Sequence, residues 1–312
     1  MKYSIKFTIS LIFIFVFAFA AQAQNSEWVR IQSDNGEFSI EMPKNPAYFY
    51  DKDGFYYPSS SFGDDDLQYG EMQMLNSADE KTVMSLEIYK VSSPKKGIDL
   101  ILQKQFSKTQ KLENLPKDFS GKQIEKTTIK DFANRKDAEV NYVSRFIASK
   151  THVYIITVAN RGAKTAAFDK FLSSARLGGN QTGDVKISSL KALTLTDIGF
   201  VATNQPKPLV PSPAPDTSKE NMSNPTPLLI LSKPVATYTE EARRKLISGT
   251  IRLRVTFEKD GRISKIGFIS VLQNGLDRNA FFAALRIKFI PLEKEGVLQT
   301  ISKTVEYSFS IG

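Results

Sequence analysis

Alternating apolar and polar residues give the clearest pattern in the chain, between residues 249 and 264. Eight successive positions alternate, with Ile251, Leu253, Val255 and Phe257 apolar and Arg252, Arg254, Thr256 and Glu258 polar. A period of two is typical of a β-strand with one apolar and one polar face. The pattern breaks at Lys259-Asp260-Gly261 and resumes at Ile263, so it predicts a β-hairpin.

Helices are predicted on both sides of this hairpin. Thr239 is a candidate N-cap for a short helix that ends before Gly249, and two glutamates follow it where the helix dipole favours acids. A second helix has one apolar face, made of Leu276, Ala280, Ala283, Ala284 and Ile287. Pro291 ends it, and residues 303–309 alternate again as a final strand. The predicted order is helix, strand, strand, helix, strand.

The first half of the chain has the pattern of an antiparallel sheet with packed helices. Strands are predicted at residues 28–31, 38–42, 71–75, 83–91, 122–130, 138–148 and 153–159. Helical spacing occurs at residues 98–112, and again in the face made by Ala163, Ala167, Phe168, Phe171 and Leu172. Together with the C-terminal part, this predicts the α+β class.

Two segments are not expected to join a core. Residues 1–23 have two lysines, an apolar run and the small-x-small sequence Ala21-Gln22-Ala23, which predicts a cleavable signal peptide and a periplasmic protein. An uncleaved inner-membrane anchor facing the periplasm is the alternative. Eight of the 14 prolines lie between Pro206 and Pro234, which predicts an extended tether. The expected parts are a signal peptide (1–23), an N-terminal domain (24–178), a linker (179–227, Pro-rich from 206) and a C-terminal domain (228–312).

Charge and composition narrow the classes of function. Residues 228–312 carry 14 basic and eight acidic side chains, a net charge of +6 within a chain total of +9. Export argues against nucleic acid as the partner of this basic domain, which leaves an anionic envelope polymer or solubility. The chain has no cysteine and one histidine, His152, so Cys/His catalysis and a multi-histidine metal site are excluded. We therefore expect no enzyme, no metal and no cofactor.

Three further features have alternative interpretations. Asp64-Asp65-Asp66 lacks the spacing of a calcium loop and is expected to be a solvated acidic loop. Aromatic residues gather between Tyr48 and Phe62, where they cover the domain's own core or form an interface. Arg252 and Arg254 either meet an anionic glycan or lipid or form a solvated strand face.

Residues 238–311 carry a family resemblance. They read YTEEARRKLISGTIRLRVTFEKDGRISKIGFIS, then GLDRNAFFAALRIKFIPLEKEG and KTVEYSFSI. This part resembles the TonB C-terminal domain family over its whole length. The matching pieces are Ala242-Arg243-Arg244, Gly249-Thr250, Asp260-Gly261-Arg262, Leu276-Asp277-Arg278 with Ala280, Phe289, Pro291, Gly296 and Phe309.

The resemblance implies a fold, a partner and a site. In the family, two helices pack on a three-stranded antiparallel sheet, and the domain binds a short extended segment, the TonB box, of outer-membrane TonB-dependent transporters. The implied edge strand that receives the peptide consists of Lys303, Thr304, Val305, Glu306, Tyr307, Ser308 and Phe309. An unpaired strand binds an extended peptide through its main chain and needs no catalytic group.

Two departures from the family limit what carries over. Where the family has a Tyr-Pro pair before the first helix, this chain has Tyr238-Thr239. Tyr238 is predicted to contact the partner, but the chain enters the helix at a different angle. Energy-coupling members keep an N-terminal helix that meets an ExbB/ExbD-type motor, so a motor is implied here only if the N-terminus is uncleaved. The alternative is a soluble envelope scaffold that reuses the TonB fold. The N-terminal domain is similar to PsbP/Mog1-like modules in element order and in the phrase FSIEMP.

Overall fold

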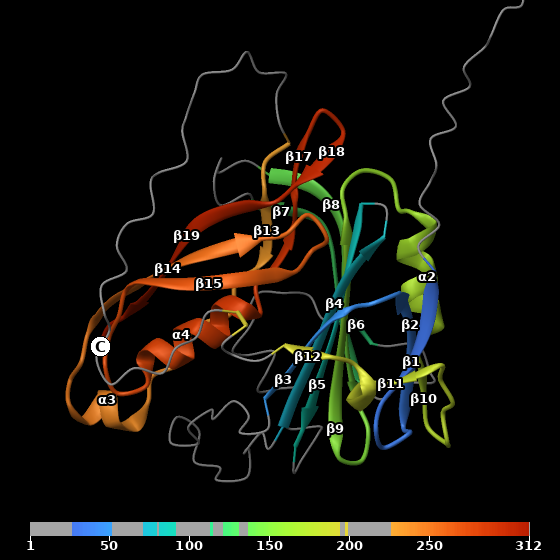
Figure 1. The fold of residues 1–312 in the computed structure, drawn as a ribbon, viewed down its shortest axis with the longest axis horizontal. Coiled ribbons are helices and arrows are strands. Elements are labelled where there is room, and N and C mark those ends of the chain that lie inside the picture. The colour runs from blue at the N-terminus through green and yellow to red at the C-terminus, as the bar shows by residue number, and fades with distance from the viewer. Residues whose placement is uncertain are drawn as a thin grey trace, which may run out of the picture.

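A computed structural model describes residues 27–51, 71–79, 81–91, 113–114, 121–130, 137–193, 197–198 and 226–311. These residues form mostly sheet with few helices, arranged as two packed parts (Figure 1). The predicted signal peptide, the predicted helix at 98–112, the acidic run at Asp64 and the Pro-rich stretch of the linker lie outside the described residues. No helix among the described residues is long and apolar enough to span a membrane.

The N-terminal part is built on an eight-stranded sheet in the order β12-β3-β4-β5-β9-β8-β7-β6. Its strands are β3 (Ala47–Asp51), β4 (Glu71–Asp79), β5 (Thr82–Lys90), β6 (Glu113–Asn114), β7 (Gly121–Lys130), β8 (Asp137–Ala148), β9 (His152–Asn160) and β12 (Ala192–Leu193). Neighbours are antiparallel except for the parallel pair β12 and β3. All the strands predicted between residues 71 and 159 are confirmed.

A smaller layer covers one face of this sheet. It contains α2 (Ala166–Ser174) and a four-stranded sheet in the order β10-β2-β1-β11. The strands are β1 (Trp28–Gln32), β2 (Phe38–Pro43), β10 (Arg176–Leu177) and β11 (Val185–Lys186), and a 3-10 turn, η2 (Ile187–Ser189), follows. Residues 185–193 were predicted to belong to the linker, but β11 pairs with β1 and β12 pairs with β3. The N-terminal part therefore extends beyond residue 178.

The C-terminal part has a three-stranded sheet in the order β15-β14-β19. Its elements are α3 (Glu240–Arg244), β14 (Gly249–Phe257), β15 (Ile263–Ser270), α4 (Leu276–Leu285) and β19 (Ile301–Phe309). The predicted hairpin is β14 and β15, and Gly261 at its turn has φ +81°, a value that favours glycine. The side chain of Thr239 accepts a hydrogen bond from the Ala242 amide, which confirms the predicted N-cap.

Four short strands of the C-terminal part were not predicted. β13 (Leu229–Ser232) pairs with β16 (Lys288–Ile290), and β17 (Leu292–Lys294) forms a hairpin with β18 (Val297–Gln299). Each has only three or four residues, which is too few for a period of two to stand out in the sequence.

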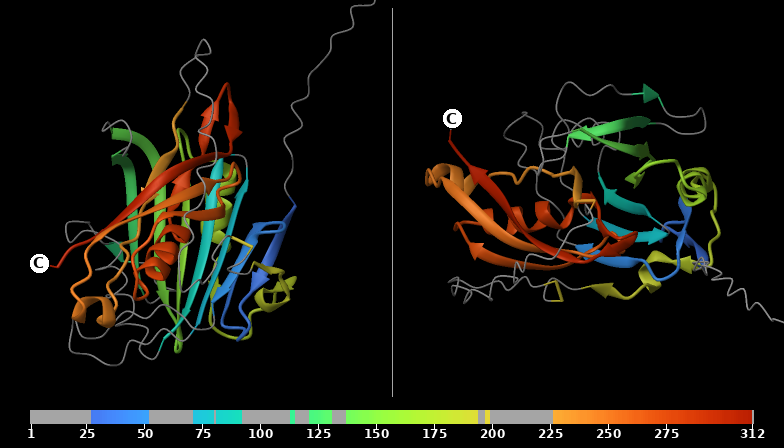
Figure 2. Two further views of the ribbon diagram at one scale, coloured as in Figure 1. Left: turned by 60° about the vertical axis from the view of Figure 1, so that its left-hand side comes forward. Right: turned by 90° about the horizontal axis from the view of Figure 1, so that it is seen from above.

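The eight-stranded sheet is buried on both faces, and the C-terminal part covers the second one. In β9, Tyr154, Ile156 and Val158 belong to the core under α2. The alternate residues Val153, Ile155 and Ala159 belong to a core shared with the C-terminal part. Figures 1 and 2 show the sheet between these two covers. An antiparallel sheet more often has one solvated face, so the nearly continuous apolar run of β9 reflects this double burial.

Helix α4 lies in the middle of the shared core. Its buried residues are Leu276, Ala280, Phe281, Phe282, Ala283, Ala284 and Leu285. The ring of Phe282 lies 6.1 Å from the ring of Phe49 on β3. The face predicted from the sequence is buried, and the adjacent phenylalanines are buried as well. A helix that is apolar on all sides requires cover on all sides, and the N-terminal sheet supplies it.

Candidate functional site

β19, which contains the predicted partner-binding residues, is an edge strand of the three-stranded sheet. Tyr307 and Phe309 are buried on the core side of the strand, and Val305 is half-buried. The other predicted residues, Lys303, Thr304, Glu306 and Ser308, are exposed. The structure thus places all seven on one strand at the edge of the sheet, with apolar side chains anchoring it and polar side chains facing solvent.

The free backbone groups of β19 follow from its register with β14. Arg252 of β14 lies opposite Glu306, and the Arg252 amide donates to Ser270 Oγ of β15 at 2.9 Å. The Glu306 carbonyl accepts from Lys233 Nζ at 2.6 Å. Both contacts point away from the β14–β19 boundary, so this is a non-hydrogen-bonded pair. Backbone groups alternate along a strand, and the amides and carbonyls of residues 302, 304, 306 and 308 therefore point outward.

The opposite edge, β15, is bonded at its centre to a segment outside the sheet. The Ile266 amide donates to the Ile198 carbonyl at 2.8 Å. A Cβ on Gly261, at the start of this edge, would lie 2.9 Å from Val83 Cγ1 of the N-terminal sheet. Ile263 is buried beside Phe49 and Met74 in the shared core. The two edges of one sheet therefore differ: β15 has a backbone hydrogen bond to Ile198 at its centre, whereas β19 pairs with no strand other than β14 among the described residues.

Tyr238, the predicted partner contact, packs beside the end of β19. Its ring meets Phe309 edge-on, with 5.3 Å between ring centroids. Its hydroxyl donates to the Ile247 carbonyl at 2.9 Å, and the Arg243 guanidinium lies 5.9 Å from the ring centroid. These contacts hold the segment before α3 against the sheet although no proline follows Tyr238.

The solvent face of the sheet is polar and internally paired. Arg252 Nε lies 2.7 Å from Glu306 Oε1, and both side chains are about half exposed. Thr250 and Thr256 form cross-strand hydrogen bonds with Ser308 and Ser302, at 3.1 and 2.9 Å. Exposed pairs of this kind stabilise a sheet only slightly. Arg252, a predicted anion contact, therefore has a carboxylate partner on the edge strand.

A buried polar cluster joins the two parts of the molecule. Lys288 Nζ of β16 lies 2.8 Å from Glu87 Oε1 of β5, with side-chain exposures of 12% and 3%. Lys288 also donates to Ser85 Oγ at 2.5 Å, and Tyr89 Oη donates to Glu87 Oε2 at 2.5 Å. Burial alone would raise the pKa of Glu87, but the charges of Lys288 and Arg286 outweigh it and hold the pKa below its ordinary value.

This cluster was not predicted, although the sequence of β5 indicates a buried charge. On β5, Ser85, Glu87 and Tyr89 alternate with Met84, Leu86 and Ile88, and the first set faces the shared core. A carboxylate in an otherwise apolar strand indicates a partner charge elsewhere in the fold. Lys288 is 201 residues away from Glu87, so no local pattern could identify it.

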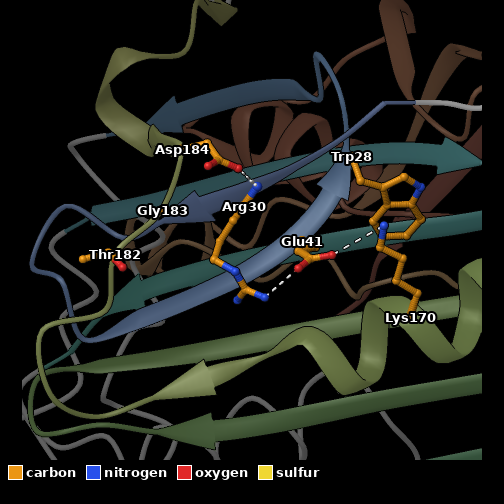
Figure 3. Close-up of a pocket in the computed structure, with 7 residues that line it drawn as sticks. All are labelled: Trp28, Arg30, Glu41, Lys170, Thr182, Gly183 and Asp184. Carbon is orange, nitrogen blue, oxygen red and sulfur yellow. Dashed lines mark hydrogen bonds and ion pairs between the residues drawn. The ribbon is translucent and has the colours of Figure 1, made fainter.

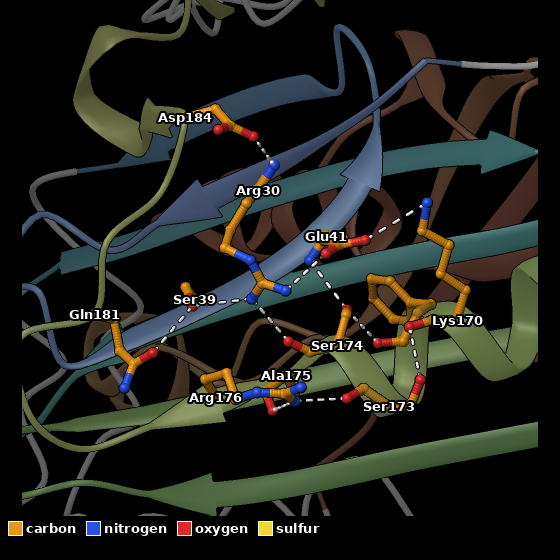
Figure 4. A network of polar contacts seen from close by, with 11 residues as sticks. Arg30, Ser39, Glu41, Lys170, Ser173, Ser174, Ala175, Arg176, Gln181 and Asp184 are labelled. Carbon is orange, nitrogen blue, oxygen red and sulfur yellow. Dashed lines mark hydrogen bonds and ion pairs between the residues drawn. The ribbon is translucent and has the colours of Figure 1, made fainter.

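A recess of about 520 Å³ in the N-terminal part was also not predicted (Figure 3). Lys170 Nζ lies 4.4 Å from the centroid of the Trp28 ring and 3.5 Å from Glu41 Oε2. Arg30 pairs with the same carboxylate at 2.7 Å, and its amide donates to Asp184 at 2.8 Å. Figure 4 shows that these groups bond to one another and to neighbouring main chain. They join α2 to the small sheet.

His152 is the first residue of β9. Its Nδ1 is 3.0 Å from Asn35 Nδ2 and 2.8 Å from Thr151 Oγ1. Burial lowers the pKa of His152, so the ring is neutral at pH 7. Among the described residues, no group of three or more His, Cys, Asp or Glu side chains is arranged to hold a metal.

Comparison with known proteins identifies the C-terminal part. The family model described as the Gram-negative bacterial TonB protein C-terminal matches residues 234–311. A search of solved structures matches the solution NMR structure of the Pseudomonas aeruginosa TonB CTD, at 22% identity and a TM-score of 0.25, over 28% of this chain and 88% of that chain. A search of curated proteins finds no match. Residues 234–311 are thus similar to the TonB C-terminal family, a family of non-enzymatic protein-interaction domains.

Proposed function

We propose that this chain is a non-enzymatic periplasmic protein that binds an extended segment of an outer-membrane transporter along β19. The observation that carries the proposal is the difference between the two edges of the three-stranded sheet. β15 is bonded to Ile198 at its centre and its turn meets Val83 of the N-terminal sheet, whereas β19 has outward backbone groups at alternate residues. An extended peptide that pairs with these groups would become a fourth strand.

A proline substitution at one position tests this mode of binding. The Thr304 amide points outward, so Thr304→Pro removes a donor from the edge and leaves the ladder to β14 intact. Thr304→Ala keeps that amide and is the matched control. The full chain is immobilised and incubated with a detergent extract of outer membranes, and bound transporters are quantified by mass spectrometry.

We expect the unmodified chain and Thr304→Ala to retain transporters and Thr304→Pro to lose at least nine-tenths of them. Chemical-shift changes on adding a peptide of the recovered transporter's TonB box should centre on residues 302–308. The proposal is rejected if no transporter is retained, or if Thr304→Pro retains as much as Thr304→Ala.

Energy coupling is a separate part of the proposal. A protein that pulls on a transporter must be anchored in the inner membrane and meet an ExbB/ExbD-type motor. Mass spectrometry of the envelope form decides between the two versions: a mature start at Gln24 indicates a soluble binder, and an intact Met1 in the membrane fraction indicates an anchored one.

The alternative is an envelope scaffold that binds an anionic polymer through its charge. It is favoured by the net charge of +6 on residues 228–312 and by the exposed arginine on β14. Binding to isolated cell-wall sacculi that disappears between 0.05 and 0.5 M salt would support the scaffold, because exposed charges are screened at high ionic strength. Strand pairing depends much less on salt.

A further inference from the structure

Lys233 lies on the edge that the proposed function assigns to a partner. Its ammonium donates to the Glu306 carbonyl at 2.6 Å and lies 4.7 Å from the centroid of the Tyr307 ring. The carbonyl is one of the outward groups of β19, and the ring belongs to the next residue of the same strand. One lysine therefore meets the edge strand through both a hydrogen bond and a cation–π contact.

The surrounding chain fixes the position of Lys233. The preceding residue, Ser232, ends β13 and pairs with Lys288 of β16. Five residues later, Tyr238 packs against Phe309 and bonds to the Ile247 carbonyl. Between them, Pro234 is buried and Ala236 packs on the shared core. Lys233 is thus held beside β19 from both sides, unlike a lysine on a free surface.

The contact conflicts with strand pairing. An added strand would donate one of its amides to the Glu306 carbonyl, and the ammonium already occupies this acceptor. A charge-assisted hydrogen bond is stronger than a neutral one, so the peptide must compete for the position. Lysines are also a common means of protecting exposed strand edges from unwanted pairing. Burial of the ammonium lowers the pKa of Lys233, so holding the charge there has a solvation cost.

We propose that Lys233 is an intramolecular competitor for the edge of β19, so that partner binding requires its displacement from the Glu306 carbonyl. This inference rests on the proposed function and adds a regulation of the same site. It predicts that the protein without a bound partner is protected against nonspecific strand addition. It also predicts that the affinity for the partner is lower than it would be without Lys233.

The test uses the full chain and an uncharged strand probe, acetyl-Thr-Val-Thr-Val-Thr-Val-Thr-amide. Because the probe carries no charge, removing a lysine from the protein does not change the long-range electrostatic attraction between the two. Three variants are compared with the unmodified chain. Lys233→Met removes the ammonium, Lys233→Arg keeps a donor, and Lys265→Met removes an equal charge from an exposed position on β15.

We expect Lys233→Met to bind the probe about five- to tenfold more tightly, as measured by NMR titration of the amides at 304, 306 and 308. Lys233→Arg and Lys265→Met should bind within a factor of two of the unmodified chain. The carbonyl carbon shift of Glu306 should change in Lys233→Met before any peptide is added, because a hydrogen bond has been lost.

The possible failures are distinguishable. If the unmodified chain binds the probe on β19 and Lys233→Met binds equally or more weakly, Lys233 is not a competitor, while strand capture stands. An equal gain in Lys265→Met would show a general charge effect and would also overturn the inference. If neither the unmodified chain nor Lys233→Met binds the probe or the transporter-derived peptide, the proposed function itself is rejected.

Discussion

The two faces of the eight-stranded sheet are covered by different kinds of partner. One cover, α2 with the small sheet, comes mostly from residues that flank the sheet in sequence, and its core is apolar. The other cover, the C-terminal part, includes residues about 200 positions away from the strands it touches, and it brings a buried ion pair with it. Its apolar contacts alone would favour many similar orientations.

We expect the ion pair to favour one orientation. Apolar packing constrains the position through shape, and a buried carboxylate without its partner is in addition strongly unfavourable. Glu87 therefore fixes where Lys288, and with it β16, can lie on the sheet. Four predictions, ordered by expected effect, test this difference between the two faces.

The largest effect is expected from Glu87→Gln. It removes the carboxylate that pairs with Lys288 in a buried site, and we expect a loss of about 3–5 kcal/mol in the free energy of unfolding. Glu71→Gln is the control on the same sheet, because Glu71 pairs with Lys90 at 3.4 Å where both are exposed. The control should lose less than about 1 kcal/mol in urea titrations. Equal losses would show that the buried pair has no special role.

Truncating one phenylalanine in each cover compares the apolar contacts. Phe168→Ala in α2 and Phe282→Ala in α4 each remove a fully buried ring, and each should cost about 3–4 kcal/mol. Because α4 contributes to a core shared with the N-terminal sheet, both variants should still unfold in one transition. A separate transition at lower temperature in Phe282→Ala, with that of the N-terminal part unchanged, would show that the two parts are independent.

Acid should weaken the second cover more than the first. The folded-state pKa of Glu87 lies below the ordinary value of 4.5, so the carboxylate stabilises the fold above pH 4.5. That stabilisation is lost as the pH falls through the folded pKa. Urea midpoints measured from pH 6 to pH 3 should decline more steeply in the unmodified chain than in Glu87→Gln. Parallel declines would contradict the assignment.

The smallest effects are expected at the helix caps. Thr165 caps α2 and Thr239 caps α3, each by accepting a hydrogen bond from a backbone amide in the first turn. Substitution of either by alanine should cost about 1 kcal/mol. Serine at the same positions should restore most of the loss, since it keeps the hydroxyl. A loss above about 2 kcal/mol at one site only would indicate that the cap also supports its interface.

The sequence was most informative where structure is local. The β14–β15 hairpin, the Thr239 cap and the longer strands of the N-terminal sheet follow from periodicity, turn residues or capping residues within a short window, whereas β3, β6 and β12 were not predicted. The docking of the two parts did not follow, because it depends on contacts between residues such as Phe49 and Phe282 that are far apart in the chain. The apolar run of β9 predicted a strand, but its double burial was not predicted from the sequence.

The candidate site shows the same limit. The residues of β19 were named from a family resemblance, and their alternation predicted a strand, but nothing local showed which edge would be open. That depends on Ile198 and Val83 meeting β15 and its turn. Lys233 was not identified because its contact with Glu306 spans 73 residues. The peptide-binding roles of β19 and of Tyr238 stay predictions.

The double burial of the eight-stranded sheet also has a consequence for the order of folding. Residues near the N-terminus leave the ribosome first, so one face of this sheet is without its cover until the last 80 or so residues are synthesised. Ser85, Thr157 and Ser144 lie side by side across three strands of that face, next to Glu87. Polar groups on an exposed sheet face oppose unwanted association, so we expect the incomplete chain to aggregate less through this face than through the face under α2. The Glu87 carboxylate that pairs with Lys288 in the complete fold is thus also expected to keep the incomplete chain soluble.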